Sequence, residues 1–372
     1  MNKVIIVGAG INGLVAANYL VKNGFDVSVI EKKPHTGGAC IKDTVEIGNK
    51  KIDFAYGATV LGMMPDFIFE ETGLSKVVQG YYPKNPKLVY FNDKESSTKI
   101  YQDHIKLEEE LREKWGETGK VNEFRNDENK VIKFIQELYK NGTSPSIDLA
   151  KDYLGKELTR LWVTGNAKDL LDHYFSSEKT KLYMGMTVIE SGPASIHDPG
   201  TAFTIPLMDS GSVYDGYWGF VRTGIWKITE DLTKINQDLG VKFYLESNIH
   251  EVDNDKNSIS FSKKNKDFKL NYDQLIFATD PVTPSKFLKG FKNDINLDLI
   301  GTSGKVTAFF NNPVRWKDSN DYSDSFRFIF SVDTLDSFES ASQNALKDLD
   351  NYFPGFIQIY PEGSAQRKMN NN

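Results

Sequence analysis

Residues 4–40 decide the fold of this chain, and they read VIIVGAGINGLVAANYLVKNGFDVSVIEKKPHTGGAC. The β-branched apolar run Lys3–Val7 predicts a strand that is buried on both faces. A glycine-rich turn follows without a gap, and then an apolar stretch, Leu14–Val21, predicts a helix that ends at Gly24. Val27–Ile30 predicts a second strand. This order of strand, turn, helix and strand is typical of a βαβ unit that binds a dinucleotide.

The residues of the turn have separate purposes. Gly8 permits the tight turn out of the strand, and Gly10 lets a pyrophosphate approach the backbone. Gly13 allows the helix to pack close to the sheet, and we expect Asn12 beside it to contact the cofactor as well. The helix start presents free N–H groups and the positive end of its dipole to the phosphates. Glu31, about twenty residues further on, can accept hydrogen bonds from ribose hydroxyls.

Two other interpretations of this stretch are weaker. A glycine-rich turn in some other α/β protein would not need the second strand and the acid in register. A secretory signal or a membrane span would not contain three glycines, Asn12 and Asn18, and only Lys3 precedes the apolar run as a basic residue.

Composition narrows the class of protein. The chain has 372 residues, of which 39% are hydrophobic and 26% charged, as expected for a globular protein of two or three domains. The net charge of −6 gives no reason to expect a nucleic-acid partner. The single cysteine, Cys40, excludes an internal disulfide and predicts a cytoplasmic location. No further apolar stretch of about twenty residues predicts a spanning helix.

The glycine pair Gly37–Gly38 follows six and seven residues after Glu31. An NAD site does not need this pair, which is a feature of flavoproteins. Residues Val4 to Cys40 resemble the FAD-dependent phytoene dehydrogenase-related proteins, which belong to the wider flavin amine oxidase and carotenoid desaturase group. Less specific similarities continue along most of the chain, at residues 52–62, 199–203, 216–224 and 275–281.

The resemblance implies that FAD is the cofactor and assigns roles to further residues. Gly8, Gly10 and Gly13 would bind the FAD pyrophosphate, and Glu31 would hold the adenosine ribose. The other implied cofactor contacts are Lys33 near the adenine end, Gly37 and Gly38 near the flavin side of the pyrophosphate, Ala39 in place of an arginine of the amine oxidases, the backbone of Ile249 at the adenine ring, and Asp280 at a strand end near the pyrophosphate.

Substrate contacts are expected from a later segment. Tyr214, Tyr217 and Trp218 are candidates for the walls of a substrate channel. Arg222 and Gly224 precede a predicted helix, Ile225–Leu239, whose start could face the flavin or an acidic group of the substrate. Cys40 could lie near the flavin, and packing is a simpler explanation for it than a covalent link.

The fold class expected is α/β, with a Rossmann-type FAD-binding domain, a β-meander and an inserted α+β substrate or cap domain. The FAD-binding domain would comprise 1–75 and 215–290, and the cap domain 76–214 and 291–372. Cap helices are predicted at 103–115, 121–140, 146–162, 167–175 and 180–190. Their lysines and glutamates are interpreted as a solvated face, and His104 and His173 as ordinary surface or core residues rather than metal ligands.

After Asp280 this sequence no longer follows the motif pattern of the related flavoproteins. Apolar runs follow at 305–310 and 327–332, and a helix is predicted at 334–352. Relatives end in a second glycine-rich strand–helix segment that contacts the flavin ring, and Gly301–Gly304 is the nearest candidate for it here. We therefore expect residues 1–372 to bind FAD weakly or not at all.

These observations predict an FAD-dependent oxidoreductase, a dehydrogenase or desaturase that takes hydride from a lipophilic, isoprenoid-like substrate and passes electrons to an unidentified acceptor. No residue can be assigned as catalytic. The alternatives are a flavin-dependent isomerase, a non-catalytic nucleotide-binding or interaction protein, and an enzyme that uses only NAD(P). The lipophilic substrate leaves open a peripheral contact with a membrane.

Overall fold

The computed structural model describes residues 2–91, 97–190, 194–288, 290–291, 303–317, 322–347 and 354–370. The chain divides into two compact units, each formed by separate segments. Unit 1 comprises Met1–Leu61, Asp66–Tyr81 and Phe220–Asp298, and unit 2 comprises Gly62–Pro65, Tyr82–Gly219 and Leu299–Asn372.

The centre of unit 1 is a four-stranded parallel sheet in the order β13-β1-β2-β9. The strands are β1 (Lys3–Val7), β2 (Asp26–Ile30), β9 (Lys242–Tyr244) and β13 (Gln274–Phe277). As predicted, β1 is buried on both faces, because it has hydrogen-bonded neighbours on both sides and apolar layers above and below.

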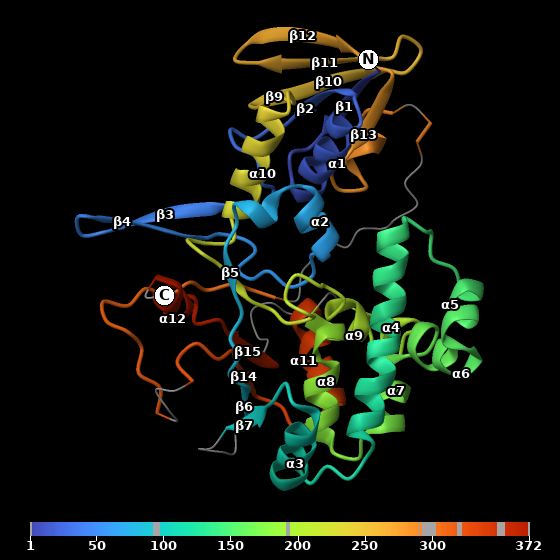
Figure 1. Ribbon diagram of the computed structural model, residues 1–372, viewed down its shortest axis with the longest axis vertical. Helices are drawn as coiled ribbons and strands as arrows, with labels where there is room; N and C mark the ends of the chain where they lie inside the picture. The colour runs from blue at the N-terminus through green and yellow to red at the C-terminus, as the bar shows by residue number, and fades with distance from the viewer. Residues whose placement is uncertain are drawn as a thin grey trace. The chain divides into compact units, whose positions relative to one another are not determined.

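Three layers make up this part of unit 1 (Figure 1). Val4 and Ile6 face the layer that contains α1 (Ile11–Lys22), where they pack in one cluster with Ala17. Ile5 and Val7 face the opposite layer, where they pack with Phe261 and other side chains of an antiparallel meander. The meander consists of β10 (Ser247–Asp253), β11 (Ser258–Lys263) and β12 (Lys266–Asn271) and was predicted.

A buried amide pair holds α1 against α10 (Lys227–Asp238). The Asn18 side-chain amide donates to Asn236 Oδ1 at 2.8 Å, and the Asn236 amide donates to the Leu14 carbonyl at 2.8 Å. Both asparagines are fully buried. Since a buried polar group must be paired, these bonds fix how the two helices pack on the sheet.

Short elements complete unit 1. They are the hairpin β3 (Lys42–Ile47) and β4 (Lys50–Ala55), the helix α2 (Asp66–Glu71), the 3₁₀ turns η1 (Leu74–Lys76) and η4 (Thr283–Lys286), and the strand pair β5 (Gly80–Tyr81) and β8 (Phe220–Val221). Alternating residues on both sides of Gly48–Asn49 predict this hairpin, and the structure forms it. Pro281 and Pro284 predict the start of a helix, but the structure has only the short turn η4 there.

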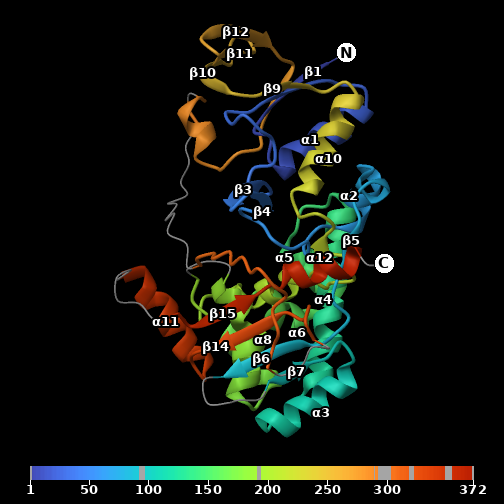
Figure 2. The ribbon, with the colours of Figure 1, turned by 90° about the vertical axis from the view of Figure 1, so that its left-hand side faces the viewer.

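Unit 2 is built on a mixed sheet in the order β15-β14-β6-β7 (Figure 2). The strands are β6 (Lys87–Phe91), β7 (Thr98–Ile100), β14 (Arg327–Phe330) and β15 (Phe356–Ile359). Three rings stack across neighbouring strands, with Phe330 centroids 5.3 Å from Phe91 and 5.5 Å from Phe356. Two helical residues also contact β14, Tyr183 at Phe328 and Phe338 at Phe330. Aromatic packing therefore forms this core.

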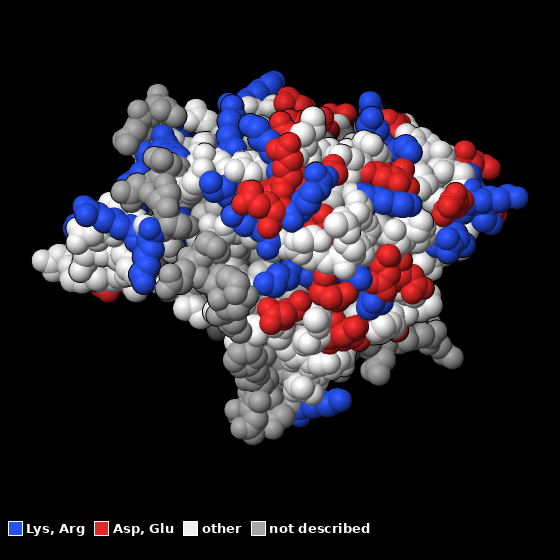
Figure 3. Space-filling view, turned by 90° about the horizontal axis from the view of Figure 1, so that it is seen from below, with Lys and Arg blue, Asp and Glu red and all other residues white. Residues whose placement is uncertain are grey.

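The helices of unit 2 are α3 (His104–Trp115), α4 (Val121–Asn141), α5 (Ile147–Leu154), α6 (Lys156–Leu158), α7 (Ala167–Tyr174), α8 (Glu178–Glu190), α9 (Thr204–Met208), α11 (Leu335–Lys347) and α12 (Glu362–Asn370), with the 3₁₀ turn η3 (Thr201–Phe203). On the face drawn in Figure 3, basic and acidic side chains are intermixed. Exposed pairs of this kind contribute little to stability.

Two predictions for unit 2 need correction, the single helix at 146–162 and the solvated face of charged residues. The single helix expected at 146–162 is α5, α6 and a π-helical turn, Thr159–Val163, because Gly155 ends α5 with φ +83°. The apolar run at 305–310, for which no element was predicted, forms neither helix nor strand and is exposed. The charged residues are not all solvated, since Glu117 and Glu128 are buried. Residues 348–352 of the helix predicted at 334–352, and Gly301 of the glycine candidate, lie outside the described residues.

Candidate functional site

The glycine-rich turn of unit 1 leaves no space for side chains at two of its positions. Gly8 has φ +102°, and a Cβ there would lie 2.8 Å from the Ala278 carbonyl oxygen. A Cβ on Gly13 would lie 2.1 Å from the Gly8 carbonyl oxygen, because α1 begins directly against the turn. These two glycines therefore serve the packing of helix and strand.

A Cβ would have free space at Gly10, whereas it would clash at Gly8 and Gly13. Its φ of −70° suits any residue, and the nearest neighbour of an added Cβ would be Gly38 Cα at 3.9 Å. Gly10 is the N-cap of α1 and provides no side-chain cap, and the first turn carries no acidic residue. Since the first N–H groups of a helix lack intrahelical partners, this end of α1 offers donors to an anion.

The predicted Gly37–Gly38 pair lies against this helix start. The Gly37 N–H donates to the Ala9 carbonyl at 2.8 Å, and Gly10 and Gly37 form an isolated parallel bridge. A Cβ on Gly38 would lie 3.0 Å from Gly10 Cα. Two glycine segments about 27 residues apart thus form one cradle without side chains, which a diphosphate can approach from the backbone.

Glu31 borders the cradle at the end of β2. Its Oε2 atom accepts a hydrogen bond of 2.8 Å from Ala9 N–H, and its Oε1 atom accepts one of 2.9 Å from Lys33 N–H. A carboxylate has about four acceptor positions, so each oxygen can accept one more hydrogen bond. This donor and acceptor set fits the diphosphate and ribose of a dinucleotide.

The structure shows no cofactor-specific geometry for the other predicted cofactor residues. Asn12, Lys33 and Ala39 are exposed. Ile249 pairs with Phe261 in the meander, at the point where the strand register shifts. The Asp280 carboxylate accepts bonds from Val282 N–H, Thr283 N–H and Thr283 Oγ1, so it caps the turn η4.

The predicted substrate residues divide between the two units. Tyr217 stacks on Tyr82 in unit 2, with centroids 5.6 Å apart, and Tyr214 contacts the same ring at 5.5 Å. Trp218 packs on Gly62, where a Cβ would lie 2.6 Å from the indole. In unit 1 the Arg222 guanidinium donates to Gln79 Oε1 at 2.7 Å. The Gly224 backbone faces the Trp226 ring, which a Cβ would approach to 2.1 Å.

Cys40 is held as a thiol. Its Sγ donates to the Ile225 carbonyl at 3.3 Å, and burial raises the pKa of the thiol to about 11. Very little thiolate is present near pH 7, and the thiolate is the reactive form. The environment therefore favours packing as the role of Cys40.

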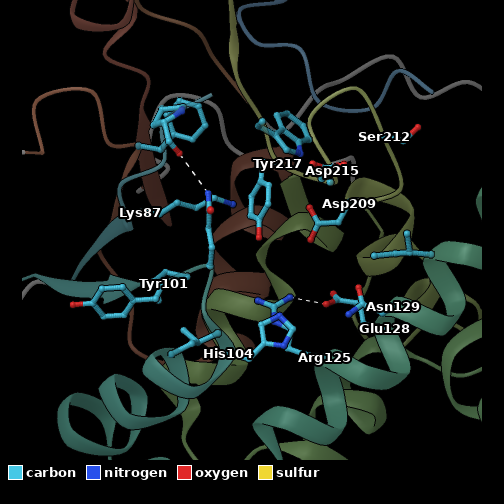
Figure 4. Close-up of a pocket in the computed structure, with 18 of the residues that line it drawn as sticks. Lys87, Tyr101, His104, Arg125, Glu128, Asn129, Asp209, Ser212, Asp215 and Tyr217 are labelled. Carbon is cyan, nitrogen blue, oxygen red and sulfur yellow. Dashed lines mark hydrogen bonds and ion pairs between the residues drawn. The ribbon is translucent and has the colours of Figure 1, made fainter. Parts of the chain in front are cut away.

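A second candidate site is a cavity of about 360 Å³ whose lining residues all belong to unit 2. Figure 4 shows its polar side chains, which come from β6, α3, α4, the end of α9 and the loop after it. Polar lining residues include Lys87, His104, Arg125, Glu128, Asp209 and Tyr217.

A buried ion pair forms one wall of this cavity. Arg125 Nη1 donates to Glu128 Oε2 at 2.6 Å, and the two side chains are only 18% and 4% exposed. Burial alone would lower the pKa of Arg125, but the Glu128 carboxylate outweighs it and leaves this pKa raised. The guanidinium is therefore charged, and burial together with Arg125 lowers the pKa of His104.

The charged residues of the cavity were not predicted from the sequence as a site. Lys87 begins an apolar strand and Asp209 follows a short helix, so no motif connects them. A signal existed for Glu128, because it shares one helical stripe with the buried residues Val121, Phe124 and Val131. A glutamate in such a stripe is buried and needs a partner.

The part of the chain that the structure describes contains neither a metal-ligand cluster nor a membrane-spanning helix. In the ranges that the structure describes, His, Cys, Asp and Glu side chains do not gather in groups of three that could hold a metal ion. None of the helices in those ranges has the length and apolar character of a membrane span.

Comparison with known proteins agrees with the first of these sites. Residues 6–67 match the NAD(P)-binding Rossmann-like domain family. The chain is 26% identical over 272 residues to the 4,4'-diapophytoene desaturase of Staphylococcus haemolyticus, covering 67% of this chain and 49% of the relative. It is 25% identical over 268 residues to a 1-hydroxycarotenoid 3,4-desaturase of a Flavobacterium species, covering 70% and 53%.

Among solved structures, the cyclohexylamine oxidase of Brevibacterium oxydans superposes with a TM-score of 0.46 at 16% identity, covering 77% of this chain and 59% of that one. The chain spans about half the length of the curated relatives it matches. The resemblance stated from the sequence is confirmed. The chain is similar to carotenoid desaturases over about two thirds of its length, and its residues 6–67 match a Rossmann-like NAD(P)-binding domain.

Proposed function

We propose that this chain belongs to an FAD-dependent oxidoreductase that removes hydride from a lipophilic, isoprenoid-like substrate. The observation that carries the proposal is the contact between Gly37–Gly38 and Gly10, with Glu31 beside it. An NAD site needs only the first glycine segment and the acid, whereas the second glycine segment extends the open backbone surface beyond the start of α1. The carotenoid desaturases named above support the choice of substrate class.

FAD, when bound, supplies the hydride acceptor, and the chain supplies binding and orientation. The α1 start would hold the diphosphate through N–H groups, and the Glu31 oxygens would accept from the ribose hydroxyls. Gly10 and Gly38 would keep side chains away from the bridge between the two halves of the dinucleotide.

The proposal is tested by titrating the 1–372 chain with FAD, and separately with NAD, while intrinsic tryptophan fluorescence and flavin fluorescence are recorded. We expect weak FAD binding, as the sequence predicts for residues 1–372, that is nevertheless stronger than NAD binding. Binding of NAD in preference to FAD would contradict the cofactor assignment. Titration is preferred to the colour of the purified protein because it also detects weak binding.

The reaction is tested in a second experiment. FAD-loaded protein is mixed without oxygen with 4,4'-diapophytoene in detergent micelles, and the flavin absorbance is followed. Bleaching would support hydride removal, whereas substrate conversion without bleaching would indicate isomerisation. Absence of both, in protein shown to hold FAD, would contradict this substrate class.

A further inference from the structure

The unit 2 cavity contains polar groups that the protein itself leaves unpaired. The Lys87 ammonium lies 6.0 Å from the centroid of the Phe328 ring, and within the described ranges it forms no hydrogen bond and no ion pair, although it acts electrostatically on Glu128 and Glu190. The Asp209 carboxylate likewise has neither an ion pair nor a side-chain hydrogen bond there. Both side chains are partly buried.

Lys87 and Asp209 do not satisfy each other, since they form no ion pair within 4.0 Å. Figure 4 shows them on opposite sides of the cavity, with the Tyr217 hydroxyl between them. The other interior charges, Arg125 and Glu128, are already paired at 2.6 Å. Among the residues that the structure describes, Lys87 and Asp209 are therefore a basic and an acidic group without an ion pair of their own on opposite sides of the cavity, although Asp209 acts electrostatically on Arg125 and Lys87 on Glu128. Lys133 and Asp215 also line the cavity, but both are exposed.

Tyrosine hydroxyls complete this polar lining. Tyr183 and Tyr217 both line the cavity, and burial raises the pKa of each, so both remain protonated near neutral pH. Neither hydroxyl has a hydrogen-bond partner in the described part of the chain. Their rings supply flat apolar surface next to the charges, which suits a ligand with a compact apolar body.

A hydrocarbon ligand does not fit such a lining, so this cavity is distinct from the site of the proposed isoprenoid-like substrate, although Tyr217 and Trp218 line it. It would remove water from Lys87, Asp209 and the two hydroxyls without replacing any hydrogen bond, and the loss for each polar group is large. A ligand with a single charge would satisfy one side and leave the other unpaired. A ligand with an acid group and an ammonium group would satisfy both sides at once.

From this juxtaposition we propose that the unit 2 cavity binds a small zwitterion, with its acid group at Lys87 and its ammonium group at Asp209. The cavity volume of about 360 Å³ is at the lower end of small-molecule sites and suits a molecule the size of an amino acid. The proposal does not depend on FAD, because every lining residue belongs to unit 2 and the chemistry is that of binding alone.

The test uses three probes that share one phenyl body. They are L-phenylalanine, which carries both charged groups, 3-phenylpropanoate, which carries the acid alone, and 2-phenylethylamine, which carries the ammonium alone. Binding to the 1–372 chain is measured by calorimetry at neutral pH and low salt. We expect L-phenylalanine to bind at least about tenfold more tightly than either single-charge probe.

Two variants test which side chain binds which charged group of the ligand. Lys87→Gln should weaken L-phenylalanine and 3-phenylpropanoate binding about tenfold and leave 2-phenylethylamine binding unchanged. Asp209→Asn should weaken L-phenylalanine and 2-phenylethylamine binding instead. Lys130→Gln is the matched control, because Lys130 is an exposed α4 residue that pairs with Asp127 and does not line the cavity.

Each outcome decides the proposal. Equal binding of the three probes, no binding of any of them, or variants that weaken all three alike would overturn it. Circular dichroism and thermal unfolding of each variant separate a folding defect from lost binding. If either variant fails to fold, the probe comparison on the unaltered chain still decides, and a failure of FAD binding would leave this result untouched.

Discussion

The Glu31 Oε2 atom accepts a hydrogen bond of 2.8 Å from the Ala9 N–H, which ties the end of β2 to the glycine-rich turn after β1. The same carboxylate accepts from Lys33 N–H at 2.9 Å. These two hydrogen bonds of Glu31 therefore stabilise unit 1, in addition to its expected role as the ribose ligand. Changes in its chemistry should affect both the stability of unit 1 and the binding of a dinucleotide.

Replacement of Glu31 by glutamine tests the structural role of this carboxylate. The amide keeps one acceptor, but its NH₂ group meets a backbone N–H where the carboxylate oxygen accepted a bond. Since hydrogen bonds to charged groups contribute about 1.5–3 kcal/mol, we expect the free energy of unfolding to fall by about that amount. Chemical denaturation measures the loss, and unchanged stability would show that neither bond contributes in solution.

The glycines of the turn are expected to separate binding from stability. Gly10→Ala should lower the free energy of unfolding by less than about 1 kcal/mol, because the new Cβ meets only Gly38 Cα at 3.9 Å. It should weaken FAD binding at least about tenfold by occupying the cradle. FAD titration and denaturation of the same preparation measure both effects.

Gly13→Ala is the comparison for that variant. Its Cβ would lie 2.1 Å from the Gly8 carbonyl oxygen, so the helix must move. Overpacking of this kind should cost at least about 2 kcal/mol of stability. If Gly10→Ala proved the more destabilising of the two, the arrangement of the turn described above would be wrong.

Cys40 gives a prediction for alkaline pH. Its folded pKa is about 11, raised by burial from 9.0, so the folded state keeps the proton at pH values where the unfolded state loses it. Stability from this group is complete below pH 9 and is lost as pH rises toward 11. Over that interval the loss should approach about 2 kcal/mol, on the order set by two pKa units.

The measurement compares the unaltered chain with Cys40→Ala, so that other groups titrating in the same range cancel. The difference in free energy of unfolding between the two should shrink from pH 8 to pH 11. In addition, the thiol should react slowly with iodoacetamide at pH 8 in the folded chain and rapidly in urea. Fast reaction of the folded chain would mean that the thiol is accessible and ionised.

The buried pair Arg125–Glu128 gives the fourth prediction. Arg125→Met should destabilise the chain by about 3–5 kcal/mol, because Glu128 then remains buried without its partner. The double variant Arg125→Met/Glu128→Leu should recover most of this loss, since both charges are absent. A double-mutant cycle in denaturant gives the coupling between the two residues.

The exposed pair Arg112–Glu108 is the control for this cycle. Its side chains are 59% and 27% exposed although the contact is 2.8 Å, so its coupling should be below about 1 kcal/mol. Equal couplings for the two pairs would show that burial does not set the strength of the Arg125 pair.

The N-terminal βαβ unit could be predicted from sequence because its signals are local. The apolar strand, the glycines and Glu31 lie within forty residues, and each is dictated by backbone geometry or by hydrogen bonding within that segment. The meander was also predictable, since turns at Asn257 and Lys264 interrupt alternating strands. Predictions of this kind rest on neighbouring residues alone.

The unit 2 cavity could not be predicted in the same way. Lys87 and Asp209 are 122 residues apart, and only the packing of β6, α4 and α9 places them around one space. The helix predicted across Gly155 failed because sequence periodicity alone did not show that this glycine would adopt φ +83°. Tertiary structure decided the first case, and the backbone freedom of glycine decided the second.

The sheet order of unit 1 has a consequence for biosynthesis. β1 pairs with β13, whose first residue, Gln274, follows Val7 by 267 positions. At about 5–20 residues per second, the ribosome needs roughly 13–53 s to make the intervening chain. During that time one edge of the central strand lacks its final neighbour and can pair with another nascent chain. The domain must therefore complete its folding late in translation, and its yield in a cell should depend on chaperones that shield this edge.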